Sequence, residues 1–179
     1  MKPFALLAIA IAANLPALAQ AQHSPYAGQE TRGIKALSAD EVTQYLAGAG
    51  MRFALAAELN RYPGPMHVLE LADKLALTPE QRAATANLMS EHKAEASAIG
   101  GRMVEAERML DQLFASGKAD RAALAQQVSR VAALHGEYRL SHLDTHVRMR
   151  AMLTGEQVNR YVALRGYEGG APLQHKQHH

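Results

Sequence analysis

Cysteine and tryptophan are absent from this chain of 179 residues, and aromatic residues together make up only 5% of it. The lack of cysteine excludes disulfide bonds, thiolate chemistry and zinc sites of the cysteine type. β-branched residues are sparse, whereas alanine and leucine, which favour helices, dominate the apolar fraction. The composition therefore predicts a single all-α domain, and the chain is long enough to bury a sizeable core.

Neither sign of charge is in large excess, because the chain has 19 basic and 17 acidic residues and a net charge of +2. This balance gives no electrostatic basis for a nucleic-acid partner. Motifs of catalysis are lacking too: there is no glycine-rich phosphate loop and no nucleophile elbow, and the stretch 142–146 lacks the glutamate of a zinc protease. We expect a protein that is not an enzyme and that binds no organic cofactor.

A long apolar run at the N-terminus predicts export. It spans residues 4–18 behind a basic start and leads into Ala17-Leu18-Ala19 and Ala19-Gln20-Ala21, which both fit the small-x-small cleavage rule. We predict that residues 1–21 are a secretory signal peptide, that the protein is periplasmic and that the mature chain has no membrane span. The alternative is an uncleaved N-terminal anchor, against which Pro16 argues.

The remainder of the chain divides at helix-capping signals. We predict an extended arm over residues 22–37, a helical domain over 38–167 and a disordered His-rich tail over 168–179. The expected helices cover residues 39–60, 66–76, 79–115, 120–152 and a last short segment that ends near residue 166.

Two of these helices are long and carry apolar residues at alternating spacings of four and three. Such heptad-like seams predict an antiparallel hairpin, with its turn about Gly117. Gly100 and Gly101 lie inside the first long helix, where we expect a soft spot that bends it.

Two similar segments bracket this hairpin, namely Leu77-Thr78-Pro79-Glu80-Gln81 and Leu153-Thr154-Gly155-Glu156-Gln157. With the signal peptide, these LTxxQ-type elements resemble the Spy/CpxP periplasmic chaperone family and the related periplasmic heavy-metal sensor and resistance proteins, over residues 65–167. The resemblance implies a hooked cradle of four to five helices, a homodimer, and a role in envelope stress or metal stress. It also implies that metal ligands come from His, Glu and Met on the helices.

Nine histidines are many for a chain of this size. His142 and His146 are one helical turn apart, so both imidazoles share a face. His92 and His142 lie equally far from Gly117 in sequence, and the antiparallel register therefore predicts that they face each other. Counting residues outward from the turn at Leu77-Thr78 in the same way predicts that His67 lies level with these histidines along the bundle.

These positions predict a site for zinc, nickel, cobalt or copper, because neutral imidazoles with a carboxylate suit such ions. The candidate ligands are His142, His146, His92, His67 and Glu70. The alternative is that His92 and His142 are a polar layer of the seam, hydrogen-bonded to each other or to Tyr138 and Ser141, while His146 faces water. The tail histidines are expected to be unstructured, although they could gather metal loosely: His175, His178 and His179.

Three functions remain open from the sequence. The first is a metal-binding envelope protein for metal sensing or resistance, working with an envelope sensor protein. The second is an ATP-independent chaperone that holds unfolded proteins and needs no metal, for which methionines on the apolar stripes would give an adaptable surface. The third is a partner-docking protein whose residues 22–37 make the contact.

Overall fold

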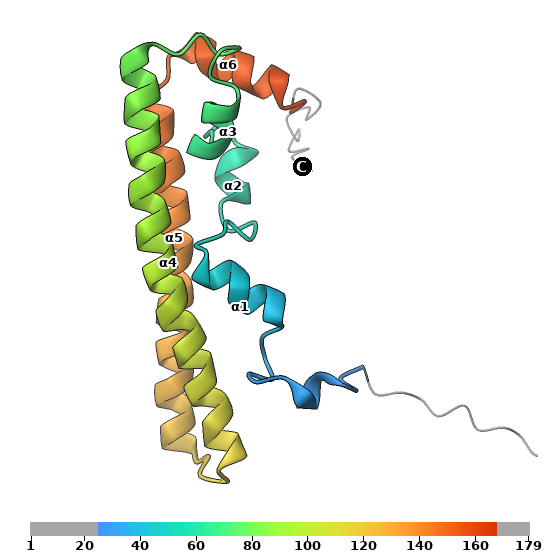
Figure 1. The fold of residues 1–179 in the computed structure, drawn as a ribbon. Helices are drawn as coiled ribbons and strands as arrows, with labels where there is room; N and C mark the ends of the chain where they lie inside the picture. The colour runs from blue at the N-terminus through green and yellow to red at the C-terminus, as the bar shows by residue number, and fades with distance from the viewer. Residues whose placement is uncertain (1–24, 168–179) are drawn as a thin grey trace, which may run out of the picture.

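The structure is a computed structural model that describes residues 25–167, and over this range it is all-helical, as predicted (Figure 1). The predicted signal peptide and the predicted tail lie outside the described residues. No helix within the described part is both long and apolar enough to cross a membrane. The elements are η1 (Gln29–Thr31), α1 (Ala39–Leu46), α2 (Leu55–Glu58), α3 (Pro65–Glu70), α4 (Pro79–Ala115), α5 (Arg121–Ala151) and α6 (Gly155–Leu164).

The antiparallel hairpin of α4 and α5 is the central element of the fold, and the shorter helices lie along one side of it (Figure 1). The expected soft spot does not interrupt α4, which continues through Gly100 and Gly101 as one helix. Gly100 is needed for a different reason. A Cβ at this position would lie 1.9 Å from the carbonyl oxygen of Tyr45, so the missing side chain lets α1 rest on α4.

The prediction of one helix over residues 39–60 is wrong, because α1 and α2 are separate. Gly48 adopts a positive φ of 64° and ends α1, and its N–H donates to the carbonyl oxygen of Tyr45. Met51 and Arg52 follow with φ values of 41° and 66°, which non-glycine residues rarely adopt. The local propensity for helix is therefore overridden by a turn that brings the chain against the hairpin.

Two other segments also differ from expectation. The helix predicted over residues 66–76 is shorter, since α3 ends at Glu70 and turns follow. The segment predicted as an extended arm forms turns and the helix η1 in its described part. Ile34 in this segment is buried, and the N–H of Lys35 donates to a carboxylate oxygen of Asp111 on α4. The buried Ile34 and this hydrogen bond both contribute to holding this part of the chain on the hairpin.

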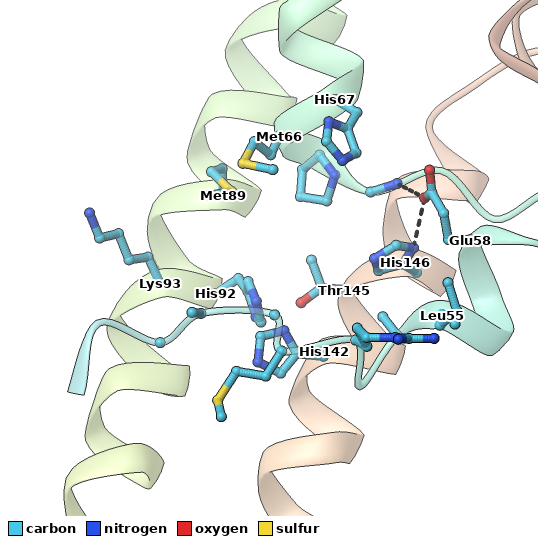
Figure 2. A pocket seen from close by; sticks show the side chains of 18 of the residues that line it. Leu55, Glu58, Met66, His67, Met89, His92, Lys93, His142, Thr145 and His146 are labelled. Atoms are coloured by element: carbon cyan, nitrogen blue, oxygen red, sulfur yellow. Dashed lines mark hydrogen bonds and ion pairs between the residues drawn. The ribbon is translucent and has the colours of Figure 1, made fainter. Parts of the chain in front are cut away.

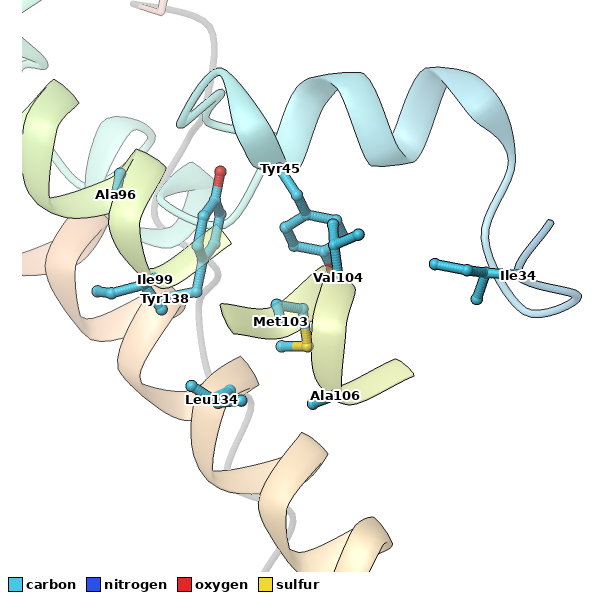
Figure 3. Packing of buried hydrophobic residues seen from close by; sticks show 9 residues of the cluster. All are labelled: Ile34, Tyr45, Ala96, Ile99, Met103, Val104, Ala106, Leu134 and Tyr138. Atoms are coloured by element: carbon cyan, nitrogen blue, oxygen red, sulfur yellow. The ribbon is translucent and has the colours of Figure 1, made fainter. Parts of the chain in front are cut away.

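Two apolar cores stabilise the molecule at different heights of the hairpin. The first core joins α1 and the segment before it to the middle of the hairpin (Figure 3), through Ile34, Tyr45, Ala96, Ile99, Met103, Val104, Ala106, Leu134 and Tyr138. The second joins α3 and α6 to the other end, through Val68, Ala72, Leu75, Leu77, Leu88, Met149, Leu153, Val158 and Tyr161.

The two LTxxQ-type elements meet at the second core. Thr78 and Thr154 both form capping boxes, with Gln81 and Gln157 as the reciprocal partners. The two glutamine side chains also bond to each other, since each amide donates to the oxygen of the other at 2.9 Å. Each capping box therefore begins its own helix and also ties the start of α4 to the start of α6.

Candidate metal centre

A pocket of about 530 Å³ opens beside the hairpin (Figure 2). Along α4 it falls between Leu88, which belongs to the second core, and Ala96, which belongs to the first. Its walls come from α2, α3, α4 and α5 and from the segments that connect α1, α2 and α3. The lining includes four histidines, three methionines and a glutamate, namely His67, His92, His142, His146, Met51, Met66, Met89 and Glu58.

His92 and His142 form the tightest pair in this pocket. Their ring centroids are 4.5 Å apart with the planes at 75°, and the residues are only 8% and 4% exposed. The antiparallel register predicted this contact from sequence. On its other sides the ring of His142 packs against Tyr138 at 4.7 Å and stacks with Phe53 at 6.3 Å between centroids. Aromatic neighbours therefore fix the orientation of the imidazole.

One nitrogen of each ring is buried without a hydrogen-bond partner among the described residues, namely Nδ1 of His92 and Nε2 of His142. The polar layer considered as an alternative would have satisfied them. However, the hydroxyl of Tyr138 donates to the carbonyl of Ala49 at 2.6 Å, and that of Ser141 donates to the carbonyl of Tyr138 at 2.9 Å. An unsatisfied buried polar group costs about 1–3 kcal/mol. A ligand that binds these two nitrogens removes that cost, which favours binding at the pair.

Burial also sets the protonation state of this pair. It lowers the pKa of His142 to about 4, with smaller effects from His92 and His146, and it lowers the pKa of His92 in the same direction. Both imidazoles are therefore neutral at pH 7. The neutral form is the one that binds a transition-metal ion, so no proton has to be displaced first.

His146 lines the same pocket but is held by other contacts. Its Nδ1 donates to the carbonyl oxygen of Tyr62 at 2.7 Å and lies 3.7 Å from a carboxylate oxygen of Glu58. The ring also covers Gly64, where a Cβ would lie 2.9 Å from the imidazole. The packing therefore leaves His146 little freedom to turn toward His92.

His67 lies apart from the His92–His142 pair, on α3 (Figure 2). Its Nδ1 donates to a carboxylate oxygen of Glu70 at 2.9 Å. Glu70 itself is exposed and is not part of the pocket wall. Among the described residues, no three histidine, aspartate or glutamate side chains are grouped closely enough to hold an ion. The five-residue ligand set therefore stays a prediction, although its four histidines share one pocket.

Sequence reasoning missed Glu58, which is buried beside His146. Its carboxylate accepts hydrogen bonds from the hydroxyls of Tyr161 at 2.5 Å and Tyr167 at 3.1 Å, and from the N–H of Gly64 at 3.2 Å. Arg165 lies 3.7 Å away. Burial and this carboxylate raise the pKa of the Tyr161 hydroxyl, so it remains a donor. No local pattern marks Glu58, because its partners come from distant parts of the chain.

Comparison with known proteins shows the family of the chain. A model of the family described as heavy-metal resistance matches residues 42–160. The chain therefore belongs to the heavy-metal resistance family, part of the Spy/CpxP-like group that the sequence resembles. No curated protein matches the chain, and neither does any solved structure.

Proposed function

We propose that this protein is exported to the periplasm and binds a divalent transition-metal ion there, in metal sensing or resistance, without catalysing a reaction. The observation that carries the proposal is the His92–His142 pair, in which one buried nitrogen of each ring lacks a hydrogen-bond partner among the described residues, in a pocket with two further histidines. Membership of the heavy-metal resistance family points to the same role. Zinc, nickel, cobalt and copper all bind neutral imidazole, so the pair does not select one of them.

The residues have distinct roles in this proposal. His92 and His142 are the ligands, and burial keeps both in the neutral state that accepts an ion. Phe53 and Tyr138 hold the ring of His142 in place. A bound ion supplies a strong partner for ring nitrogens that have none among the described residues. Binding is therefore expected to stabilise the folded protein by about 2.7 kcal/mol at an ion concentration 100 times Kd.

Calorimetric titration with zinc, nickel, cobalt and copper tests the proposal. The tail histidines are replaced by Gln in every sample, so that they contribute nothing: His175, His178 and His179. We expect one ion per chain, bound tighter than millimolar, and at least 100-fold weaker binding in His92→Ala/His142→Ala. Gln112→Ala is the control, because Gln112 is exposed on α4 outside the pocket. Equal affinity in both variants would exclude this site.

A chaperone without metal is the second candidate, and exposed apolar side chains favour it. Leu55, Leu59, Tyr62 and Met66 are 38–56% exposed and lie on the short segment that lines the pocket. Such a surface suits unfolded polypeptide. The protein would then suppress aggregation of a denatured model protein equally well with and without a chelator. Leu59→Ser/Met66→Ser should reduce this activity, and aggregation at the control rate with the unchanged protein would end the candidate.

A further inference from the structure

The pocket around His92 and His142 offers an ion fewer ligands than it needs. First-row divalent ions take four to six ligands. Among the described residues only these two imidazole rings are in direct contact, with centroids 4.5 Å apart. Within the described residues no third histidine or carboxylate joins the pair. The histidines and carboxylates of the described residues therefore leave two to four coordination positions of the ion open.

The space beside the pair is much larger than an ion. The pocket volume of about 530 Å³ lies in the range of sites for small organic molecules, about 300–1,000 Å³. Its walls are mostly small or apolar, with Ala47, Ala54, Leu55, Pro65 and Met89 among them. Water alone in such a space would leave these side chains unburied, whereas an organic group would cover them.

Charge indicates what kind of organic group fits. Arg52 and Lys93 line the pocket and are exposed, and neither forms an ion pair with any described residue. The one carboxylate in the lining, that of Glu58, is already occupied by Tyr161 and Tyr167. The pocket therefore presents two cationic side chains that have no anionic partner in the part of the chain that the structure describes.

We infer that the pocket takes its metal as a complex with a small chelator that carries carboxylates, of the amino-carboxylate class. His92 and His142 fill the positions that the chelator leaves open, and the apolar walls cover its carbon atoms. Arg52 and Lys93 pair with its free carboxylate oxygens. The inference rests on the proposed function, because it needs the same two ligands, and it adds the form in which the ion arrives.

Equilibrium dialysis with nickel and iminodiacetate tests this inference. Iminodiacetate occupies three positions of the ion and leaves the rest open. The tail histidines are again replaced by Gln, and both nickel and iminodiacetate are measured on the protein side. We expect one nickel and one iminodiacetate per chain, bound at least tenfold tighter than nickel added alone. His92→Ala/His142→Ala should retain neither component.

The variant Arg52→Gln/Lys93→Gln separates this inference from simple metal binding. Both side chains are exposed, so the fold should persist, as thermal unfolding can verify. Binding of the nickel–iminodiacetate complex should fall about tenfold in this variant, while binding of nickel alone stays unchanged. Retention of nickel without iminodiacetate, or complex binding that is indifferent to this variant, would overturn the inference and leave the proposed function intact. Retention of nickel in neither form would overturn both.

Discussion

At the scale of single residues, His142 links the pocket to the stability of the fold. Its imidazole is 4% exposed, and burial lowers its pKa from 6.5 to about 4. The unfolded chain therefore takes up a proton near pH 6.5, whereas the folded chain does so only near pH 4. Stability from this difference is fully present above pH 6.5 and is lost as the pH falls toward 4.

Urea denaturation of the metal-free protein between pH 7 and pH 4.5 measures this contribution. Each pH unit below 6.5 is worth about 1.4 kcal/mol, so the free energy of unfolding should fall by about 2–3 kcal/mol from this residue. His142→Leu removes the titrating group and should lose that much less over the same range. Parallel pH profiles for the two proteins would contradict the link.

At the scale of elements, adjacent glycines of α4 have opposite roles. Gly100→Ala should lower the free energy of unfolding by about 2 kcal/mol, because the new Cβ would collide with the backbone of Tyr45 and push α1 away. Gly101→Ala meets nothing within 4 Å and should raise it by about 0.5–1 kcal/mol through helix propensity. Thermal and urea unfolding of both variants gives the comparison, and equal effects of the same sign would show that α1 does not rest there.

The pair of Gln81 and Gln157 is a second prediction at this scale. Gln157→Leu should cost about 2 kcal/mol, because it removes the capping box of α6 and leaves the amide of Gln81 with one partner fewer. Gln112→Leu, on an exposed position of α4, is the control and should change little. The measurement is the midpoint of urea unfolding. A similar cost for both substitutions would mean that the contact between the two elements contributes nothing.

Features of the fold and site that depend on neighbouring residues could be predicted from the sequence, whereas features that depend on packing between distant segments could not. The capping boxes of Ser38, Thr78 and Thr154 need only four neighbouring residues, and all three are present where the sequence carries helix-capping signals. The contact of His92 with His142 needed only an antiparallel register. Glu58 could not be predicted as a site residue, because its partners depend on how α2 and α6 pack together. No local periodicity in the sequence indicates that packing.

At the scale of the whole molecule, the shorter helices cover the hairpin along only part of its length. None of the residues 107–133 is buried, and Phe114 and Val128 are 61% and 53% exposed. We predict that amides in this tip exchange with solvent at least 100-fold faster than those near Leu88 and Tyr138, since they lack a covered core. Hydrogen exchange followed by mass spectrometry gives both rates.

A homodimer, which we expect from the family resemblance, would alter that pattern. If the second copy covers the tip, exchange there should slow as protein concentration rises, and sedimentation should show a heavier species over the same range. Phe114→Asp should then restore fast exchange at high concentration. Exchange that is independent of concentration, together with a monomer in sedimentation, would remove the expectation.

The carboxylate of Glu58 accepts from the turn before α3, from α6 and from Tyr167, all within a short reach of His146. Tyr161 is not part of the pocket wall, yet Tyr161→Phe would remove one hydrogen bond to that carboxylate. Under the proposed function, a genetic screen for cells that no longer tolerate metal should therefore return substitutions from the far end of the chain as well as from the histidines. A map of such mutants drawn on the sequence would look scattered, and drawn on the fold it would converge on one acidic group.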